Sequence, residues 1–232
     1  TGPEPWFAHV GFFDVHRAWK EESTFAPDEV DVPPYLPDNP EGRRDLTHFH
    51  QNILEMDEAV GRVLDAVAQP GLEERALVIF TTDHGSPFPR AKSTFYDPGI
   101  RIPFAAHWKG VVEGGRECGQ LLSNLDFTPT ILDLCGCPIP DGLEGESFRP
   151  MLEGEVFEGR DAVFGALYYD AFYDPIHSVR TKTHKYIRSF GVTPEDAAGA
   201  DPEVLARHET GTWIRADDSD VQRSLAWQSM LG

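Results

Sequence analysis

The sequence predicts an α/β protein in which helices cover a mixed or parallel β-sheet. Three stretches support this fold class. Residues 76–82, ALVIFTT, are apolar, β-branched and short, as expected of a buried strand in a parallel sheet. Residues 45–69 place apolar side chains at three- and four-residue steps, which predicts a helix leading into that strand, or half of a βαβ unit. Residues 5–13, PWFAHVGFF, predict a second core strand.

Size and composition indicate a folded domain. The chain has 232 residues and a hydrophobic content of 40%, enough for a substantial core. No run approaches the ~20 apolar residues that a membrane helix needs, so we expect no membrane span. The net charge of −19 argues against a nucleic-acid-binding face. The chain opens on Thr-Gly-Pro without an initiator Met, which predicts a piece of a longer protein.

The first predicted strand ends at a polar cluster, Asp14-Val15-His16-Arg17. Residues 20–42 are rich in Pro, Asp and Glu and predict a long surface loop. In the helix that follows, Asp45 is the expected N-cap, and Pro70-Gly71 marks the end.

Later elements are shorter. Residues 102–108 predict a strand, and a short helix is expected near 126–135, with Asp126 as its N-cap and Pro129 in its first turn. After this helix, three short strands are expected at residues 162–169, 177–181 and 184–189. The acidic remainder, 193–232, predicts helical pieces.

The strand at 76–82 ends at Asp83-His84-Gly85. Ligands bind beyond the carboxyl ends of strands in open α/β sheets, so an acid and an imidazole are well placed there for chemistry. Gly85 lets the backbone turn sharply behind them. The alternative is an Asp that caps a turn beside an exposed His, and the residues that follow favour chemistry.

Residues 92–103, KSTFYDPGIRIP, resemble the Lys-Gly-Thr-x-Tyr-x-x-Gly-x-Arg-x-Pro segment of sulfatases of the alkaline phosphatase superfamily. Ser93 stands where Gly is usual in that family, and the rest of the spacing holds. The lead-in at 86–90, SPFPR, is most similar to the branch of heparan N-sulfatase-like and arylsulfatase A-like sulfatases. The resemblance implies an alkaline-phosphatase-like fold, here partial, with a catalytic-domain part at 1–154 and a small antiparallel α+β subdomain at 155–232.

The resemblance also implies roles for individual residues. Two would bind a metal, two would act in catalysis and contact the sulfate group, and two are weaker candidates for substrate binding. These are Asp83 and His84 for the metal, His16 and Lys92 for catalysis and sulfate, and Arg90 and His177 for substrate. His177 replaces an Arg often found at its position in the family.

The resemblance implies two cofactors. Calcium is the expected metal, although an imidazole ligand at position 84 suits Zn²⁺ or Mn²⁺ better. Sulfatases use a formylglycine made from Cys or Ser in a Cys-x-Pro-x-Arg motif, but Cys137 is followed directly by Pro138. We therefore expect the nucleophile upstream of this chain, and no turnover by the chain alone.

The expected function is hydrolysis of sulfate esters or N-sulfate groups, with a sulfated small molecule or glycan as partner. A periplasmic, secreted or lysosomal-type compartment is expected from the family, and nothing in the sequence selects an oligomeric state. Two alternatives stay open: a metal-dependent phosphomonoesterase or phosphodiesterase of the same superfamily, and a non-catalytic remnant of the fold. The sequence upstream of Thr1 would discriminate among them.

Overall fold

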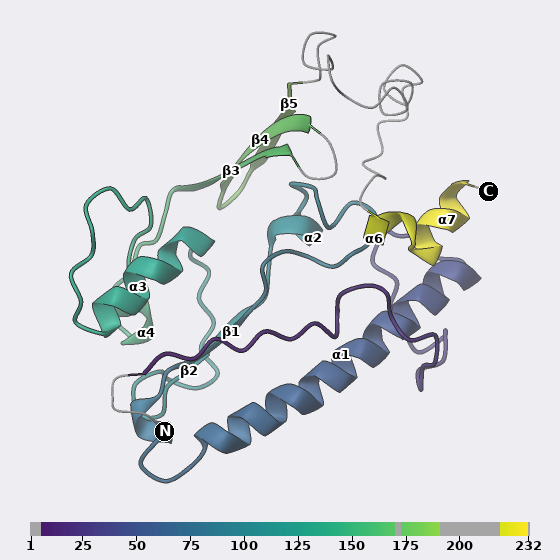
Figure 1. The fold of residues 1–232 in the computed structure, drawn as a ribbon. Helices are drawn as coiled ribbons and strands as arrows, with labels where there is room; N and C mark the ends of the chain where they lie inside the picture. The colour runs from purple at the N-terminus through teal and green to yellow at the C-terminus, as the bar shows by residue number, and fades with distance from the viewer. Residues whose placement is uncertain (1–5, 170–172, 191–218, 232) are drawn as a thin grey trace.

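One long helix, two small antiparallel sheets and several short helices make up the chain in the computed structural model, which describes residues 6–169, 173–190 and 219–231 (Figure 1). Among these residues, no helix is both long and apolar enough to cross a membrane. The helices are α1 (Pro40–Val67), η1 (Glu73–Arg75), α2 (Asp97–Ile100), η2 (Asn124–Asp126), α3 (Phe127–Leu134), α4 (Arg149–Leu152), α6 (Ser219–Gln222) and α7 (Leu225–Leu231). The strands are β1 (Val78–Thr81), β2 (Phe104–His107), β3 (Ala162–Tyr169), β4 (Tyr173–Thr181) and β5 (Lys185–Ser189).

Helix α1 begins five residues before its predicted start. The side chain of Asn39 caps it by accepting a hydrogen bond from the Gly42 N–H at 2.8 Å, and Pro40 occupies the first turn, where its missing N–H costs nothing. The prediction that Asp45 caps this helix is therefore wrong. Asp45 lies inside the helix and is buried, where it binds other side chains.

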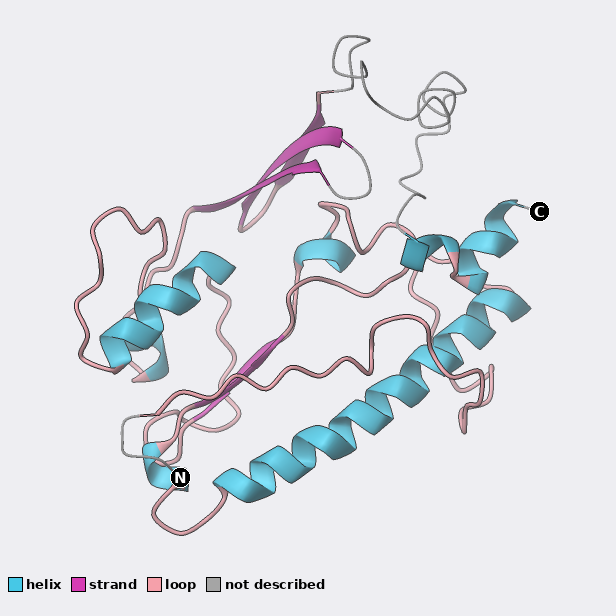
Figure 2. Cartoon of the chain, in the orientation of Figure 1, coloured by secondary structure: helices cyan, strands magenta, loops and turns pink. Residues whose placement is uncertain are grey.

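The prediction of a strand at residues 5–13 is wrong for residues 6–13, the part of it that the structure describes. Residues 6–13 form a loop and no strand (Figure 2). The side chains of Phe7 and Phe13 are exposed. A strand needs a neighbour to pair its backbone N–H and C=O groups, and none of the described strands pairs with this segment.

The predicted strands at 76–82 and 102–108 are present as β1 and β2. They pair antiparallel, with Val78 opposite His107 and Thr81 opposite Phe104, so the parallel neighbour expected for β1 is not found among the described strands. The connecting segment explains the pairing, because it turns back on itself: the Gly85 N–H donates to the Gly99 carbonyl at 2.9 Å. The returning chain then runs beside β1.

The short helix expected near 126–135 is α3, preceded by η2. Asp126 stands at the position before α3 but gives that helix no side-chain cap. Its carboxylate instead accepts from the backbone N–H groups of Ser123 and Glu146, both at 2.8 Å, and from the Arg160 guanidinium. Asp126 therefore does not cap α3 as predicted; it completes the capping box of η2 with Ser123 and connects that turn to the segments of Glu146 and Arg160.

The three predicted C-terminal strands form an antiparallel sheet of order β3-β4-β5. The helical pieces predicted for the acidic remainder include α6 and α7, whereas residues 193–218 lie outside the described residues. Helix α7 packs against α1, as the yellow and blue helices show in Figure 1. The C-terminal end of the described chain is thereby brought to the start of α1.

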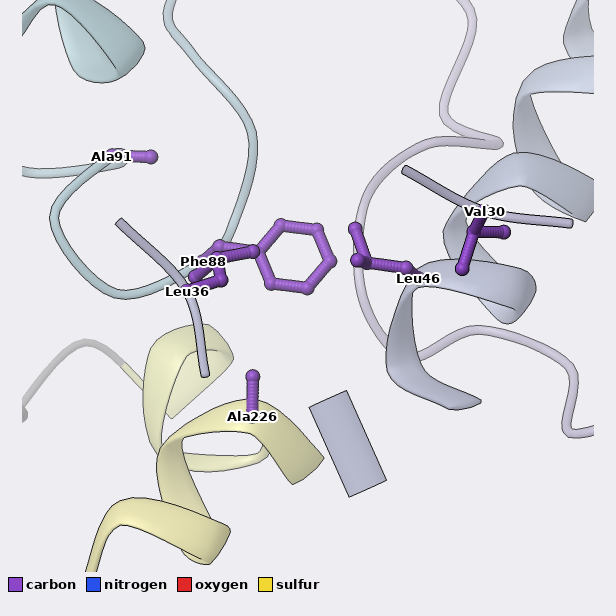
Figure 3. Close-up of a cluster of buried hydrophobic side chains, with 6 residues drawn as sticks. All are labelled: Val30, Leu36, Leu46, Phe88, Ala91 and Ala226. Atoms are coloured by element: carbon purple, nitrogen blue, oxygen red, sulfur yellow. The ribbon is translucent and has the colours of Figure 1, made fainter. Parts of the chain in front are cut away.

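A buried apolar cluster joins these parts (Figure 3). It draws on the loop before α1, on α1 itself, on the segment after β1 and on α7. The members of the cluster are Val30, Leu36, Leu46, Phe88, Ala91 and Ala226. In Figure 3 the ring of Phe88 points toward Leu46 of α1. The cluster fixes the 86–92 loop against α1 and α7.

Candidate functional site

Asp83 and His84 follow β1, as the sequence predicts. The imidazole Nδ1 lies 2.8 Å from the Gly85 carbonyl, and Nε2 lies 3.6 Å from Asp83 Oδ2. A metal-binding His typically donates its other ring N–H to a carbonyl or carboxylate, which leaves one nitrogen lone pair for the ion. The other Asp83 oxygen, Oδ1, accepts from the His84 backbone N–H at 2.9 Å, and because the side chain is 85% exposed, its oxygens keep lone pairs that a ligand can reach. The pair can therefore offer one oxygen and one nitrogen to the same cation.

Gly85 is required where the chain leaves this pair. A Cβ atom built at Gly85 would lie 1.7 Å from the Pro98 carbonyl oxygen, far inside van der Waals contact. This close approach allows the hydrogen bond from Gly85 to Gly99. Asp83 and His84 are thereby held against the turn that begins α2.

The 86–92 loop is held by its own backbone. The Ser86 carbonyl accepts from Phe88 N–H at 2.8 Å and from Lys92 N–H at 3.0 Å, while Phe88 and Ala91 are buried. Ser93 has φ of 62°, in the left-handed region that favours Gly. This conformation explains why Gly is the usual residue in the matching family segment.

Lys92 and His16 meet at one carboxylate oxygen. Lys92 Nζ lies 2.6 Å from Asp220 Oδ2, and His16 Nε2 lies 3.2 Å from the same atom. The Lys92 and Asp220 side chains are 16% and 6% exposed, and that of His16 is 39% exposed. The structure thus brings together the two predicted catalytic residues. Sequence reasoning missed Asp220, which looks like any other acid in an acidic stretch.

The imidazole of His16 is held on three sides. Its ring stacks on Phe13 with centroids 4.6 Å apart, and its Nδ1 lies 2.5 Å from the Arg17 carbonyl. With Nε2 at Asp220, both ring nitrogens face oxygen acceptors. Nε2 is thereby directed at the Asp220 carboxylate, to which an N–H on that nitrogen would donate.

Arg17 supports His16 from the neighbouring position. Its guanidinium binds Asp45 with two hydrogen bonds of 2.8 and 2.9 Å, donates from Nε to the Pro87 carbonyl at 3.1 Å and lies 3.7 Å from the Trp19 ring centroid. The Ser224 hydroxyl also donates to Asp45, at 2.6 Å. One buried ion pair thus connects the segment of His16, the 86–92 loop, α1 and the start of α7. The position of Asp45 beside the apolar side chains of the predicted helix is the feature of the sequence that could have indicated a buried ion pair.

The Lys92–Pro103 segment is also tied to the C-terminal sheet. Arg180 donates to Asp97 at 2.8 Å, and Lys185 donates to both Asp97 and the Phe95 carbonyl. The hydrogen bond from Lys185, helped by Arg180, holds the pKa of the Asp97 carboxyl below its ordinary value. These contacts fix α2 against β4 and β5.

The two weaker candidates lie elsewhere. Arg90 is exposed in the left-handed region, with φ of 61°. His177 of β4 contacts the Tyr168 hydroxyl at 2.9 Å and packs edge-on against Phe190. The structure therefore groups His16 with Lys92 and Asp83 with His84, and it places His177 within the C-terminal sheet.

Within the described ranges, no group of three or more His, Cys, Asp or Glu side chains could hold a metal ion. Asp83 and His84 alone do not make up a complete metal site there. Their side chains are 85% and 39% exposed and their facing atoms lie 3.6 Å apart, which fits a role as two donors of a larger site. Further ligands would have to come from outside the described residues.

Two family models match the sequence. The model described as "Sulfatase" matches residues 1–137, more than half of the chain. This chain belongs to the sulfatase family. The model "N-sulphoglucosamine sulphohydrolase, C-terminal" matches residues 89–196 of this sulfatase, in agreement with the motif at 86–103.

Characterised relatives agree with that assignment. The sulfatase chain is 35% identical over 163 residues to an ulvan-active sulfatase from Formosa agariphila, a match that covers 70% of the chain and 27% of the relative. It is 31% identical to human N-sulphoglucosamine sulphohydrolase, covering 65% of the chain and 37% of the relative. The chain spans about a third of the length of such relatives.

Solved sulfatase structures share the fold. A 2-O GAG sulfatase superposes with a TM-score of 0.57 at 22% identity, covering 72% of this chain and 41% of that one. A structure in complex with D-glucosamine-2-N,6-O-disulfate gives 0.56 at 20% identity, covering 77% and 42%. The predicted alkaline-phosphatase-like α/β class is therefore confirmed, as part of that fold.

Proposed function

We propose that this chain forms part of an enzyme that hydrolyses sulfate esters or N-sulfate groups on carbohydrates. One observation supports this most directly: Lys92 Nζ and His16 Nε2 converge on a single anionic oxygen. A sulfo group presents anionic oxygens of the same kind, and two preorganised donors aimed at one of them stabilise charge during hydrolysis. Relatives active on ulvan or named for N-sulphoglucosamine favour a carbohydrate substrate.

Lys92 and His16 divide the work in this proposal. The compact ammonium of Lys92 neutralises charge on a sulfo oxygen. His16 donates from Nε2 to the sulfo group or to the leaving oxygen or nitrogen, because imidazole exchanges protons near neutral pH. Arg17, next to His16, donates to Asp45 of α1 and to the Pro87 carbonyl of the loop that ends at Lys92, so it fixes the positions of His16 and Lys92 relative to each other.

Asp83 and His84 are the residues of this chain that would hold a divalent metal, with Ca²⁺ proposed and Zn²⁺ or Mn²⁺ as alternatives. When bound, the metal would supply charge stabilisation at the sulfonyl oxygens. The nucleophile we propose is a formylglycine upstream of Thr1. The chain's net charge of −19 opposes a sulfated substrate at long range, but salt damps that repulsion beyond ~8 Å, so local cations decide binding.

The test uses the parent protein that contains this chain, assayed for release of inorganic sulfate from N-sulfoglucosamine and 4-nitrophenyl sulfate. Lys92→Ala should lower the rate by about 100- to 1000-fold. Lys109→Ala is the matched control, because Lys109 pairs with Glu73 on the surface and should leave the rate unchanged. Activity of the Lys92 variant within a few-fold of wild type would reject the role.

The same assay separates the alternatives. Faster release of phosphate from 4-nitrophenyl phosphate than of sulfate from its sulfate analogue would favour the phosphoesterase reading. Release of neither product by the parent protein, with sulfate binding intact, would favour a non-catalytic module.

A further inference from the structure

Asp220 occupies the position that the proposed function assigns to a substrate oxygen. Its Oδ2 accepts from Lys92 Nζ at 2.6 Å and lies 3.2 Å from His16 Nε2. A carboxylate oxygen and a sulfo oxygen are both anionic acceptors, and charge-assisted hydrogen bonds form with either. The two therefore compete for the same donors.

His16 shows why the two cannot bind together. Its Nδ1 faces the Arg17 carbonyl at 2.5 Å, and its Nε2 faces Asp220. A ring with both nitrogens engaged has no further N–H for a substrate. Lys92 is less restricted, because an ammonium has three N–H donors. For His16 to reach a sulfo group, the Asp220 carboxylate has to turn away.

The attachment of the C-terminal helices allows such a movement. Helix α7 is anchored to α1 and its N-cap independently of Asp220: the Ser224 hydroxyl donates to Asp45 at 2.6 Å, and the Asn39 amide donates to the Ser229 hydroxyl at 3.0 Å. Asp220 lies on α6 (Ser219–Gln222), a single turn joined to the start of α7 by a hydrogen bond from the Ser224 N–H to the Val221 carbonyl at 3.0 Å. Rotation about the Asp220 side-chain bonds can take its carboxylate away from the two donors while α7 stays in place.

We propose that Asp220 is a built-in competitor for the sulfo-group site, which a bound substrate displaces from Lys92 and His16. The proposal rests on the proposed function of those two donors. In the absence of substrate the carboxylate pairs with them and offsets the charge of a largely buried ammonium. It also weakens the binding of free sulfate, so that the product leaves more readily than a sulfated sugar with additional contacts.

The test measures the affinity of the parent protein that contains this chain for inorganic sulfate by calorimetry. Asp220→Asn removes the competing charge and should bind sulfate about 10-fold more tightly than wild type, since one charge-assisted hydrogen bond no longer has to be broken. Asp65→Asn, on the exposed surface of α1, removes the same charge elsewhere and should change the affinity less than about twofold, because salt screens distant charges. In the Lys92→Ala, Asp220→Asn double variant the gain should vanish.

The results separate the two proposals. If Asp220→Asn binds sulfate no better than wild type while Lys92→Ala still weakens binding, the competitor role is overturned and the proposed function stands. If Lys92→Ala leaves sulfate binding unchanged in both backgrounds, the proposed function fails, and the competitor role with it.

Wild-type protein gives a second test, which decides the matter if Asp220→Asn and Asp220→Ser both fail to fold. With ¹³C-labelled aspartate, saturating sulfate should shift the Asp220 carboxyl resonance, and the shift should be absent in Lys92→Ala. An unmoved resonance at saturating sulfate would overturn the proposal.

Discussion

The guanidinium of Arg17 and the carboxylate of Asp45 form a buried, two-bond ion pair at 2.8 and 2.9 Å. Each partner carries a further contact: Arg17 with the Pro87 carbonyl, and Asp45 with the Ser224 hydroxyl. Four segments that are distant in sequence therefore depend on one pair. Among them are the segment of His16 and the loop that ends at Lys92.

Breaking this pair should destabilise the fold strongly. Asp45→Asn leaves the Arg17 charge buried without its partner, which typically costs about 3 to 5 kcal/mol. We expect a loss of that order in the free energy of unfolding measured in urea. Asp65→Asn is the control, because Asp65 is exposed on the same helix. A loss below about 1 kcal/mol, the range of a surface ion pair, would show that the pair contributes little.

The Asp97 contacts predict an acid-sensitive link between α2 and the C-terminal sheet. The hydrogen bond from Lys185 lowers the pKa of Asp97 in the folded state. A depressed carboxyl pKa stabilises the fold above its unfolded value of about 3.9, and this stabilisation is lost as pH falls through the folded pKa. Because Asp97 is nearly half exposed, we expect no more than about 1 kcal/mol. Asp97→Asn should flatten the acid limb of a stability-versus-pH curve; an unchanged limb would contradict the assignment.

The sequence predicted elements best where one local pattern determined them. The apolar spacing of residues 45–69 predicted α1, but its start was missed because Asn39 and Pro40 lie in a stretch whose composition predicts a loop. Residues 5–13 have the composition of a strand, yet composition cannot supply a pairing partner, and no described strand pairs with 6–13.

In the candidate site, too, residues close together in sequence were predicted, and contacts between distant residues were not. Asp83, His84 and Lys92 lie close in sequence, so a motif could predict them together. Asp220 lies 128 residues from Lys92, and its contact depends on the packing of α7 against α1. No local pattern reports such a contact. The ion pair of Arg17 and Asp45 was missed for the same reason, because an acid near a helix start also resembles a cap.

Ser93→Gly should stabilise the protein. Ser93 has φ of 62°, and a non-glycine residue in the left-handed region costs roughly 1 to 2 kcal/mol. Relief of about 1 kcal/mol would raise the melting temperature by about 2 to 4 °C in a chain of this size. Arg90→Gly, at φ of 61°, should change it in the same direction. Lower melting temperatures in both variants would show that side-chain contacts outweigh the backbone cost.

Gly85→Ala should do the opposite. The added methyl group would lie 1.7 Å from the Pro98 carbonyl oxygen, so the backbone behind Asp83 and His84 has to move. We expect a loss of about 3 kcal/mol or more, at the upper end of overpacking costs. Gly61→Ala is the matched control: apart from the neighbouring residues and backbone of α1 itself, no atom lies within 4 Å of its added methyl group, and within a helix this change should stabilise by up to about 1 kcal/mol. Equal melting temperatures for the two variants would remove the packing argument.

His84 allows the identity of the proposed metal to be tested by exchange of a single ligand. Ca²⁺ prefers oxygen ligands, whereas Zn²⁺ and Mn²⁺ accept imidazole nitrogen. His84→Gln replaces the ring nitrogen near Asp83 Oδ2 with an amide oxygen. If calcium is the metal, elemental analysis of the parent protein should show its content retained in His84→Gln and lost in Asp83→Ala. If zinc or manganese is the metal, both variants should lose it, because the nitrogen ligand that favours those ions is gone.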